Sequence, residues 1–539
     1  MLDSIELAFA GILLTLFLIW PRAGPFFKAL AKRTAWCMLL LAVLPVGLRL
    51  TLWRRASAPI PSTADDMSYL LLADTLSHFR LSNPPHAFAR FFETNFVLQT
   101  PTYSSIFPLG QGIALALGKI VFGHPWAGVL LSEGIFCALC YWMLREWIAP
   151  AWALAGGFLA VIEFGPLSYW MNSYWGGAVS GIAGCLVFGA LPRRNGWLLG
   201  LGLGLQLITR PYEFLLLLFS VVLIAGWSRL KPATAASAAA ILVPFLALTA
   251  AHNRAVTGSW TMLPYQLSRD RYGVPATFTF QPNPTPQGDL SQEQRDDYEA
   301  QSLIHDREAR LPFIRRFAGR LRYARFFFLP ALYLALAGFV FTLGDPRMRL
   351  ALIPIAIFAI GTTFYPYFYP HYLAAVACLF LLMIVAGLEW IGRWSAPAAL
   401  LVFLLAVGHF AFWSGLHLAA SDETLAAMLP YETSDYVNRG DPEGRAAVRK
   451  RLADSPGKQL VFVRFAPSHP LREWIGNEAN IDQSRVVWAL DLGRQENEKL
   501  RRYYPDRTVW LLEPDDRPPR LQPYAQTLGI HLESVPSAP

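Results

Sequence analysis

Long apolar stretches that carry almost no charge recur along most of the chain. Phe214 to Trp227 and Leu373 to Leu388 are two of them. A helix needs about 20 apolar residues to cross roughly 30 Å of hydrocarbon, so the pattern predicts about twelve membrane-spanning helices. The predicted spans are residues 5–21, 35–53, 126–144, 151–169, 176–191, 196–210, 212–228, 234–251, 326–343, 349–365, 372–391 and 396–417.

One further apolar stretch, residues 106–122, differs from these spans. It is short and rich in glycine, and it contains Lys119. A charged residue in so short a segment favours a helix that lies at the membrane surface, or one that enters and leaves on the same side.

The last part of the chain has a different pattern. Residues 460–463, 486–490 and 508–512 are short apolar runs, which are typical of buried strands. Residues 493–504, between the last two runs, have the pattern of an amphipathic helix. The sequence therefore predicts an all-α polytopic membrane protein with a small C-terminal α/β domain outside the membrane.

The composition indicates that lipid, rather than water, surrounds most of the chain. Hydrophobic residues make up 54% of the 539 positions and charged residues only 16%. Soluble chains carry roughly 25% charged residues. The formal net charge is +8, but many basic residues lie in short gaps between apolar runs, and no nucleic-acid-binding motif is present. We therefore expect membrane lipid, and no nucleic acid, among the partners.

The basic residues also predict an orientation. Short gaps that contain them, such as residues 193–194, belong on the cytoplasmic side. The membrane part, residues 1–419, then has its N-terminus and its two long loops, residues 54–125 and 252–325, on the outer side, together with the domain of residues 420–539. The arginines of the second loop that oppose this orientation are Arg315, Arg316, Arg320, Arg322 and Arg325.

The first outer loop contains two adjacent carboxylates, Asp65 and Asp66, at the start of a helical pattern. With Thr63 they resemble a capping box, in which an acid of the first turn stabilises the helix start. The alternative is a functional carboxylate at the membrane surface, acting as a general base or as a ligand of metal or substrate. A helix N-terminus that faces the site would also favour a bound phosphate. The two interpretations are compatible.

The motifs that follow the acidic pair resemble a known superfamily. They are Tyr69, the element Phe107-Pro108-Leu109-Gly110-Gln111-Gly112, the run Leu115-Ala116-Leu117-Gly118, and Phe122-Gly123. This order is similar to that of C-type glycosyltransferases, which include protein O-mannosyltransferases and the aminoarabinose transferases that modify lipid A. The resemblance covers the membrane part and is strongest in residues 60–145. One departure is that the family often has Tyr-Pro-Pro where this chain has Phe107-Pro108-Leu109.

The resemblance implies a polytopic enzyme that moves a sugar from a polyprenyl-phosphate carrier to an acceptor outside the membrane. Asp65 or Asp66 would be the catalytic base, and Tyr69 would contact the substrate. The family pattern favours Asp66 because of the positions of Met67 and Tyr69. No cofactor is firmly implied and the sequence has no recognisable metal-ligand spacing, although some relatives use a divalent metal. The implied donor is a polyprenyl-phosphate-linked sugar.

Polar residues near the ends of the spans are further candidates for substrate contacts. Arg210 carries a guanidinium that matches phosphate geometry, and the alternative is a local ion pair with Glu213. His371 and Tyr372 belong to an aromatic turn that either lines the site or forms a belt at the membrane interface.

Three more residues are candidate substrate contacts for separate reasons. Glu163 lies within a predicted span, where a charge is costly and therefore suggests function. Asn172 belongs to the aromatic turn that follows that span, and Glu93 is a third acid of the first outer loop. The alternative for Glu93 is a solvated loop charge.

These features predict a glycosyltransferase of the cell inner (cytoplasmic) membrane, with its site on the outer side and with inversion at the sugar. The sequence does not specify the class of acceptor. The main alternative is a transporter or flippase of lipid-linked saccharides, which would explain the spans and the intramembrane acids equally well. A non-catalytic scaffold is a third hypothesis. The lack of an internal repeat, which many transporters carry, and the paired acids favour the enzyme.

Overall fold

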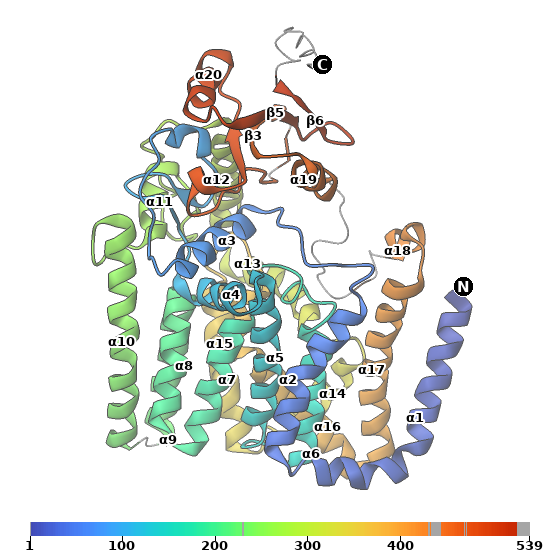
Figure 1. Ribbon diagram of the computed structural model, residues 1–539. Helices are drawn as coiled ribbons and strands as arrows, with labels where there is room; N and C mark the ends of the chain where they lie inside the picture. The colour runs from blue at the N-terminus through green and yellow to red at the C-terminus, as the bar shows by residue number, and fades with distance from the viewer. Residues whose placement is uncertain are drawn as a thin grey trace.

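In the computed structural model most of the chain is helical, and the structure describes residues 2–228, 231–428, 432, 444–467, 469–470 and 472–524. Apolar helices stand side by side in a bundle (Figure 1). Each predicted span overlaps one of them. The bundle helices are α1 (Leu2–Leu30), α2 (Thr34–Thr51), α5 (Pro125–Leu144), α6 (Pro150–Phe164), α7 (Ala178–Arg193), α8 (Gly196–Thr209), α9 (Pro211–Ser228), α10 (Pro232–Thr257), α14 (Leu332–Val340), α15 (Pro346–Thr362), α16 (Ala377–Trp394) and α17 (Ala396–Ala419).

The lengths of these helices qualify the predicted number of spans. Within the described residues, five helices are long and apolar enough to cross a membrane, and the bent pair Phe9–Ile19 and Ala23–Leu30 within α1 would make a sixth. The count of about twelve spans is not confirmed, because helices such as α6 and α8 fall short of the roughly 20 residues that a straight span needs. The five are Thr34–Thr51, Pro125–Leu144, Pro232–Thr257, Pro370–Trp394 and Ala396–Ala419.

The short apolar stretch that the sequence sets apart forms α4 (Leu109–Phe122), a helix of 14 residues at one end of the bundle (Figure 1). It approaches α5 closely through Gly118 and Gly128. A Cβ atom at Gly118 would lie 2.2 Å from the backbone nitrogen of Gly128, which is closer than any real contact. Small residues therefore let the two backbones touch and fix α4 against the bundle.

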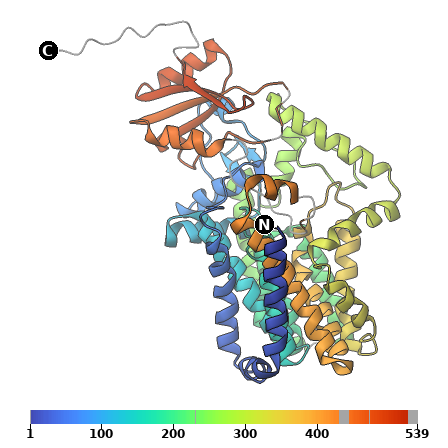
Figure 2. The same ribbon diagram turned by 90° about the vertical axis from the view of Figure 1, so that its right-hand side faces the viewer.

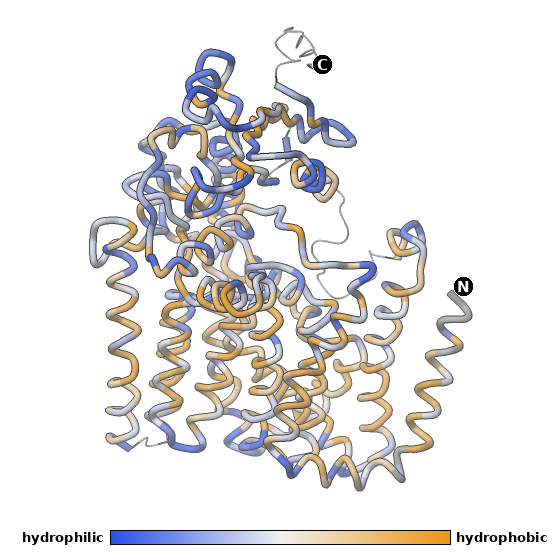
Figure 3. Tube along the Cα trace, viewed as in Figure 1, coloured by the Kyte–Doolittle hydropathy of each residue, from blue (hydrophilic) through white to orange (hydrophobic). Residues whose placement is uncertain are grey.

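A polar layer covers the same end of the bundle, as the hydropathy along the trace shows (Figure 3). It consists of the two long loops, residues 54–125 and 252–325, and the C-terminal part of the chain (Figures 1 and 2). Its helices are α3 (Ala64–Ser77), α11 (Pro264–Tyr272), α12 (Gln292–Arg310), α13 (Phe313–Leu321), α19 (Arg445–Asp454) and α20 (Arg494–Tyr503). The single-turn and other short elements are η1 (Ala89–Phe92), β1 (Val97–Leu98), β2 (Ser104–Ser105), η2 (Arg322–Phe326), η3 (Pro370–Val376), α18 (Asp422–Met428) and η5 (Ile481–Gln483).

The C-terminal part contains a four-stranded sheet, which confirms the three predicted strands and adds a fourth. The strands are β3 (Lys458–Val463), β4 (Val486–Leu490), β5 (Arg507–Glu513) and β6 (Arg520–Pro523), in the order β4-β3-β5-β6. β3 runs parallel to both β4 and β5, whereas β6 is antiparallel to β5. The predicted helix at residues 493–504 is α20.

The sheet shares a hydrophobic core with the first long loop. Leu71 of α3 and Phe91 of η1 pack in one buried cluster with Leu460 and Phe462 of β3. Polar contacts join the same two parts: Arg80 donates a hydrogen bond of 2.9 Å to the side-chain oxygen of Asn480. The sheet thus packs directly on the loop that holds the acidic pair.

Candidate functional site

A cavity of about 670 Å³ lies where the bundle meets the polar layer. The N-terminus of α3, the junction of α8 and α9, the helices α11 and α12, and the turn before η3 surround it. Its side chains include both charged groups and many aromatic rings. The lining residues with polar or aromatic side chains are Thr63, Asp65, Tyr69, Asn95, Phe96, Phe107, Trp175, Thr209, Arg210, Tyr212, Glu213, Tyr265, Arg269, Phe278, Asp297, Gln301, Tyr365, Tyr367, Tyr369, His371, Tyr372 and Arg472.

The two adjacent carboxylates of α3 have different surroundings. Asp66 is fully buried and completes a capping box with Thr63. Its carboxylate accepts hydrogen bonds from the backbone nitrogens of Ser62, Thr63 and Tyr174 at 3.2 to 3.3 Å, and from the Thr63 hydroxyl at 3.0 Å. Asp65 is not part of this box and lines the cavity. The cap therefore uses Asp66 and leaves Asp65 to face a ligand.

The surroundings of Asp65 favour its protonated form. Burial is the largest cause, and together with the neighbouring charge of Asp66 and the more distant Asp297 it raises the pKa of Asp65 to about 7, against the opposing effect of Arg210. Burial also raises the pKa of Asp66, which its hydrogen bonds partly offset. A carboxylate whose pKa lies near neutrality can accept a proton from a hydroxyl and release it again.

Arg210 lies at the end of α8 and points its charge toward the same cavity. Its Nη1 atom is 3.9 Å from Oε1 of Glu213, so the local ion pair that the sequence offers as an alternative is present. The guanidinium carbon also lies 5.4 Å from the ring centre of Tyr372, within cation–π range. Because Arg210 forms the pair and still lines the cavity, the two interpretations of this residue are compatible.

The position of α4 helps to place Arg210. A Cβ atom at Gly110 would lie 2.0 Å from Oγ1 of Thr209, the residue before Arg210. Only glycine allows the start of α4 to approach the end of α8 this closely. Gly110 of the Pro-Gly element thus helps to position Arg210, although Gly110 itself does not line the cavity.

Aromatic side chains form much of the wall. Tyr69 stacks on Phe107 with ring centres 4.2 Å apart and planes at 6°. His371 Nδ1 lies 3.0 Å from the hydroxyl of Tyr169, which also accepts a hydrogen bond from the His371 backbone nitrogen. The predicted contacts Tyr69, His371 and Tyr372 all line the cavity.

The sequence did not single out Arg269, Asp297, Gln301 or Arg472, which also line the cavity. Gln301 donates a hydrogen bond of 2.9 Å to Asp297 and accepts one of 2.9 Å from the backbone of Ala276. Burial raises the pKa of Asp297 to about 6. These residues come from α11, α12 and the C-terminal part, and charged residues in long polar segments carry no pattern that marks them. Only the folded arrangement identifies them.

Three predicted contacts lie outside the cavity lining. Glu163 accepts a hydrogen bond of 3.2 Å from the backbone of Leu329 and borders a separate small pocket. Asn172 accepts a hydrogen bond of 2.7 Å from Nε of the buried Arg49, so its role is to satisfy a buried charge. Glu93 is half-buried, and burial raises its pKa to about 7.

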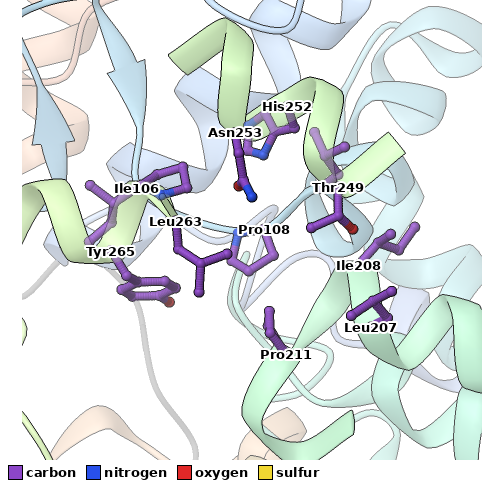
Figure 4. A pocket seen from close by; sticks show the side chains of 12 residues that line it. Ile106, Pro108, Leu207, Ile208, Pro211, Thr249, His252, Asn253, Leu263 and Tyr265 are labelled. Atoms are coloured by element: carbon purple, nitrogen blue, oxygen red, sulfur yellow. The ribbon is translucent and has the colours of Figure 1, made fainter. Parts of the chain in front are cut away.

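A small apolar pocket of about 20 Å³ adjoins the cavity (Figure 4). Pro108, Pro211, Leu263 and Tyr265 border both spaces. Its volume is that of about one water molecule, so it cannot hold a sugar. Within the part of the chain that the structure describes, no three His, Cys, Asp or Glu side chains are arranged as a ligand set for a metal ion.

No protein-family model and no curated protein matches the chain, but solved structures are similar to it. ArnT from Cupriavidus metallidurans in the apo state has 12% identity and a TM-score of 0.49, over 89% of this chain and 93% of that one. The Archaeoglobus fulgidus oligosaccharyltransferase in complex with Zn and sulfate has 14% identity and a TM-score of 0.42, over 88% and 67%. The oligosaccharyltransferase AglB from the same organism, in complex with an inhibitory peptide and a dolichol-phosphate, has 13% identity and a TM-score of 0.39, over 88% and 69%.

The identities and TM-scores are low, so neither a substrate nor an activity transfers from these proteins to this chain. The chain resembles these solved structures over 88–89% of its length.

Proposed function

We propose that this chain is a glycosyltransferase of the cytoplasmic membrane that moves a sugar from a polyprenyl-phosphate carrier to an acceptor hydroxyl on the outer side. The observation that supports it most is a single cavity that brings Asp65, Arg210 and a wall of aromatic rings together at the membrane boundary. The proposal includes the predicted set of about twelve spans, with the short helices crossing as part of a packed bundle.

The proposed chemistry is a single displacement. The oxygen of the acceptor hydroxyl bonds to the anomeric carbon as the bond from that carbon to the carrier phosphate breaks. The phosphate leaves with the electron pair, and Asp65 takes the hydroxyl proton. The pKa of Asp65 suits this role, since it lies near neutrality, and the reaction inverts the configuration at the sugar.

Arg210 is the proposed partner of the leaving phosphate. Its guanidinium can donate two parallel hydrogen bonds to phosphate oxygens and so stabilise the charge that develops on them. Glu213 and the ring of Tyr372 hold the guanidinium in place before substrate binds. A preorganised cation costs little reorganisation during the reaction.

The cavity also has a wall that suits a lipid carrier. Leu215 of α9 lines the cavity and is 57% exposed on the surface of the bundle. An isoprenoid chain could leave the cavity past this residue and lie along the apolar helices. Tyrosine rings such as Tyr69 offer the stacking faces and hydroxyls that sugars use.

The test is transfer of radiolabelled sugar from a panel of polyprenyl-phosphate donors by the purified protein in liposomes. Asp65→Asn is compared with Asp66→Asn at equal amounts of folded protein. The proposal expects transfer by the wild type and by Asp66→Asn, and its loss in Asp65→Asn. Movement of intact lipid-linked sugar across the bilayer, with no transfer from any donor, would replace the enzyme with a transporter.

A further inference from the structure

A second cavity of about 500 Å³ lies beside the first. Trp175, Tyr367 and Tyr369 line both spaces and form the wall between them. The second cavity is bounded by η2, the end of α12 and the turn before η3, and its charged residues are Glu308, Arg320 and Arg322. Its volume is within the range of small-molecule sites, and nothing in the proposed reaction uses it.

The charges of this cavity are positioned for an anion. Arg320 is largely buried, and its Nη2 donates hydrogen bonds to the backbone oxygen of Tyr365 at 2.8 Å and to Oε2 of Glu308 at 3.3 Å. Its Nε atom is buried and has no hydrogen-bond partner among the described residues. Arg322 is exposed, and its guanidinium lies 4.8 Å from the ring centre of Tyr323. Two guanidinium groups against one carboxylate leave the cavity with a net positive charge.

The helix that leads into the cavity has the character of a membrane-surface helix. Apart from Arg320, whose side chain is 13% exposed, most of α13 is open to its surroundings, and Ile314 and Leu321 are 68% and 60% exposed. The same helix carries Arg315, Arg316 and Arg320. It lies where the bundle meets the polar layer (Figure 1). Exposed apolar side chains together with arginines on one short helix favour a position among lipid headgroups, with the apolar residues directed into the acyl boundary.

We propose that the second cavity binds the phosphodiester headgroup of an anionic phospholipid, held between Arg320 and Arg322 while α13 lies in the membrane interface. The ligand is a bilayer lipid that is neither the sugar donor nor the acceptor. The charge of the cavity and the exposed apolar residues of its entrance helix support a lipid over a soluble anion.

Binding at this site would act on the first cavity through the backbone. Arg320 holds the carbonyl oxygen of Tyr365, and Tyr365 and Tyr367 both line the first cavity. A lipid phosphate that competes with Glu308 for Arg320 therefore acts on the turn that forms one wall of the proposed reaction site. The binding itself does not depend on the proposed transferase activity.

The test is to titrate the full-length protein, in a neutral detergent, with dihexanoyl phosphatidylglycerol and to measure the dissociation constant by microscale thermophoresis. Dihexanoyl phosphatidylcholine and inorganic phosphate are titrated in parallel. Arg322→Ala should weaken phosphatidylglycerol binding by about fivefold, since an arginine near an anionic headgroup contributes to that extent. Glu308→Gln should tighten it, because it removes the competing carboxylate. The control Arg310→Ala changes the charge of α12 outside the cavity and should have no effect.

Equal binding of phosphatidylcholine, or equal affinity of wild type, Arg322→Ala and Glu308→Gln, would overturn the proposal. Inorganic phosphate that binds as tightly as the lipid would show a soluble-anion site and overturn the assignment to lipid.

Arg320→Lys tests the buried guanidinium: it keeps the charge but loses the forked geometry, and should weaken binding without preventing folding. A protein that binds the lipid but transfers no sugar would contradict the proposed function alone.

Discussion

The first and second long loops, residues 54–125 and 252–325, meet across the same cavity, but they are attached to the rest of the molecule in different ways. Most residues of α3 in the first loop are buried, and it packs on α4 below and on the C-terminal sheet above. In the second loop, most of α13 is open to its surroundings, and α12 meets the C-terminal part at the His469–Glu293 contact of 3.8 Å. The tightly packed side carries the candidate base, and the more open side carries residues suited to contact a substrate as it enters.

The difference is visible in single contacts. Asp74 of α3 binds Lys119 of α4 at 2.5 Å and accepts a hydrogen bond of 2.6 Å from the backbone of Ala479. One carboxylate thus joins three segments. Asp297 of α12 bonds only to Gln301 of its own helix, among the contacts described. A reacting group needs a fixed position, since small displacements cost rate, whereas a group that selects substrate can tolerate movement.

The largest expected effect separates the two neighbouring acids. Asp65→Asn should lower kcat by about 10² to 10⁴ because it removes the general base. Asp66→Asn should instead lower the free energy of unfolding by about 1–3 kcal/mol, because it disturbs a buried acceptor of four hydrogen bonds. Transfer rates and thermal unfolding of both variants provide the check. If Asp65→Asn and Asp66→Asn lower kcat equally and are equally stable, the two acids do not have the separate roles assigned to them.

The next effect compares packing on the two sides. Leu72→Ala in α3 removes a side chain that is 2% exposed and should cost about 2–5 kcal/mol of stability. Leu321→Ala in α13 removes an exposed side chain, and should change stability by no more than about 0.5 kcal/mol in detergent. Thermal unfolding in detergent measures both. A large loss in Leu321→Ala would show that α13 is packed more tightly than its exposure indicates.

A smaller effect concerns the role of the second loop. Arg269 lines the cavity and donates a hydrogen bond of 2.8 Å to the backbone of Pro275. Arg269→Gln should raise KM for the donor by about threefold to tenfold and leave kcat close to the wild-type value, because it weakens ground-state and transition-state binding equally. Steady-state kinetics with varied donor separates the two constants. A fall in kcat alone would place Arg269 with the reacting groups instead.

A last effect is a dependence on pH. The pKa of Asp65 is raised from 3.8 to about 7, so activity should rise as pH increases through about 7 and the base loses its proton. The same shift means that the folded state binds this proton more tightly than the unfolded state. Its stabilisation is present below about pH 4 and is lost as pH rises toward 7. The temperature of thermal unfolding should therefore fall more between about pH 5 and pH 8 in the wild type than in Asp65→Asn. If this temperature changes with pH in the same way in both proteins, the raised pKa does not belong to Asp65.

Several features of the fold follow from local patterns in the sequence. The long apolar runs predict the bundle helices, the short glycine-rich run predicts α4, and three short apolar runs predict β3, β4 and β5. The number of spans does not follow, because helix length depends on where tertiary contacts end each helix. The fourth strand, β6, was not predicted, since it is short and polar and forms only by pairing with β5.

The candidate site was predictable only in part. The sequence indicates Asp65, Tyr69, Arg210, His371 and Tyr372 as candidate site residues, and all of them line the cavity. The spacing Thr63-Ala64-Asp65-Asp66 also contains the signal that separates the two acids, because a capping box uses the third residue of the helix. The family pattern favours Asp66, whereas the cap geometry favours Asp65. Asp297 and Arg472 required the structure, since they reach the cavity from segments far apart in the chain.

The hydrogen bond between Asp74 and Ala479 joins residues 405 positions apart. During synthesis α3 is made early, but the sheet that packs on it arrives only when nearly the whole of residues 1–524 has been translated. We therefore expect chains that stop before residue 458 to insert their helices and yet lack an assembled site. If the proposed function holds, such chains would transfer no sugar.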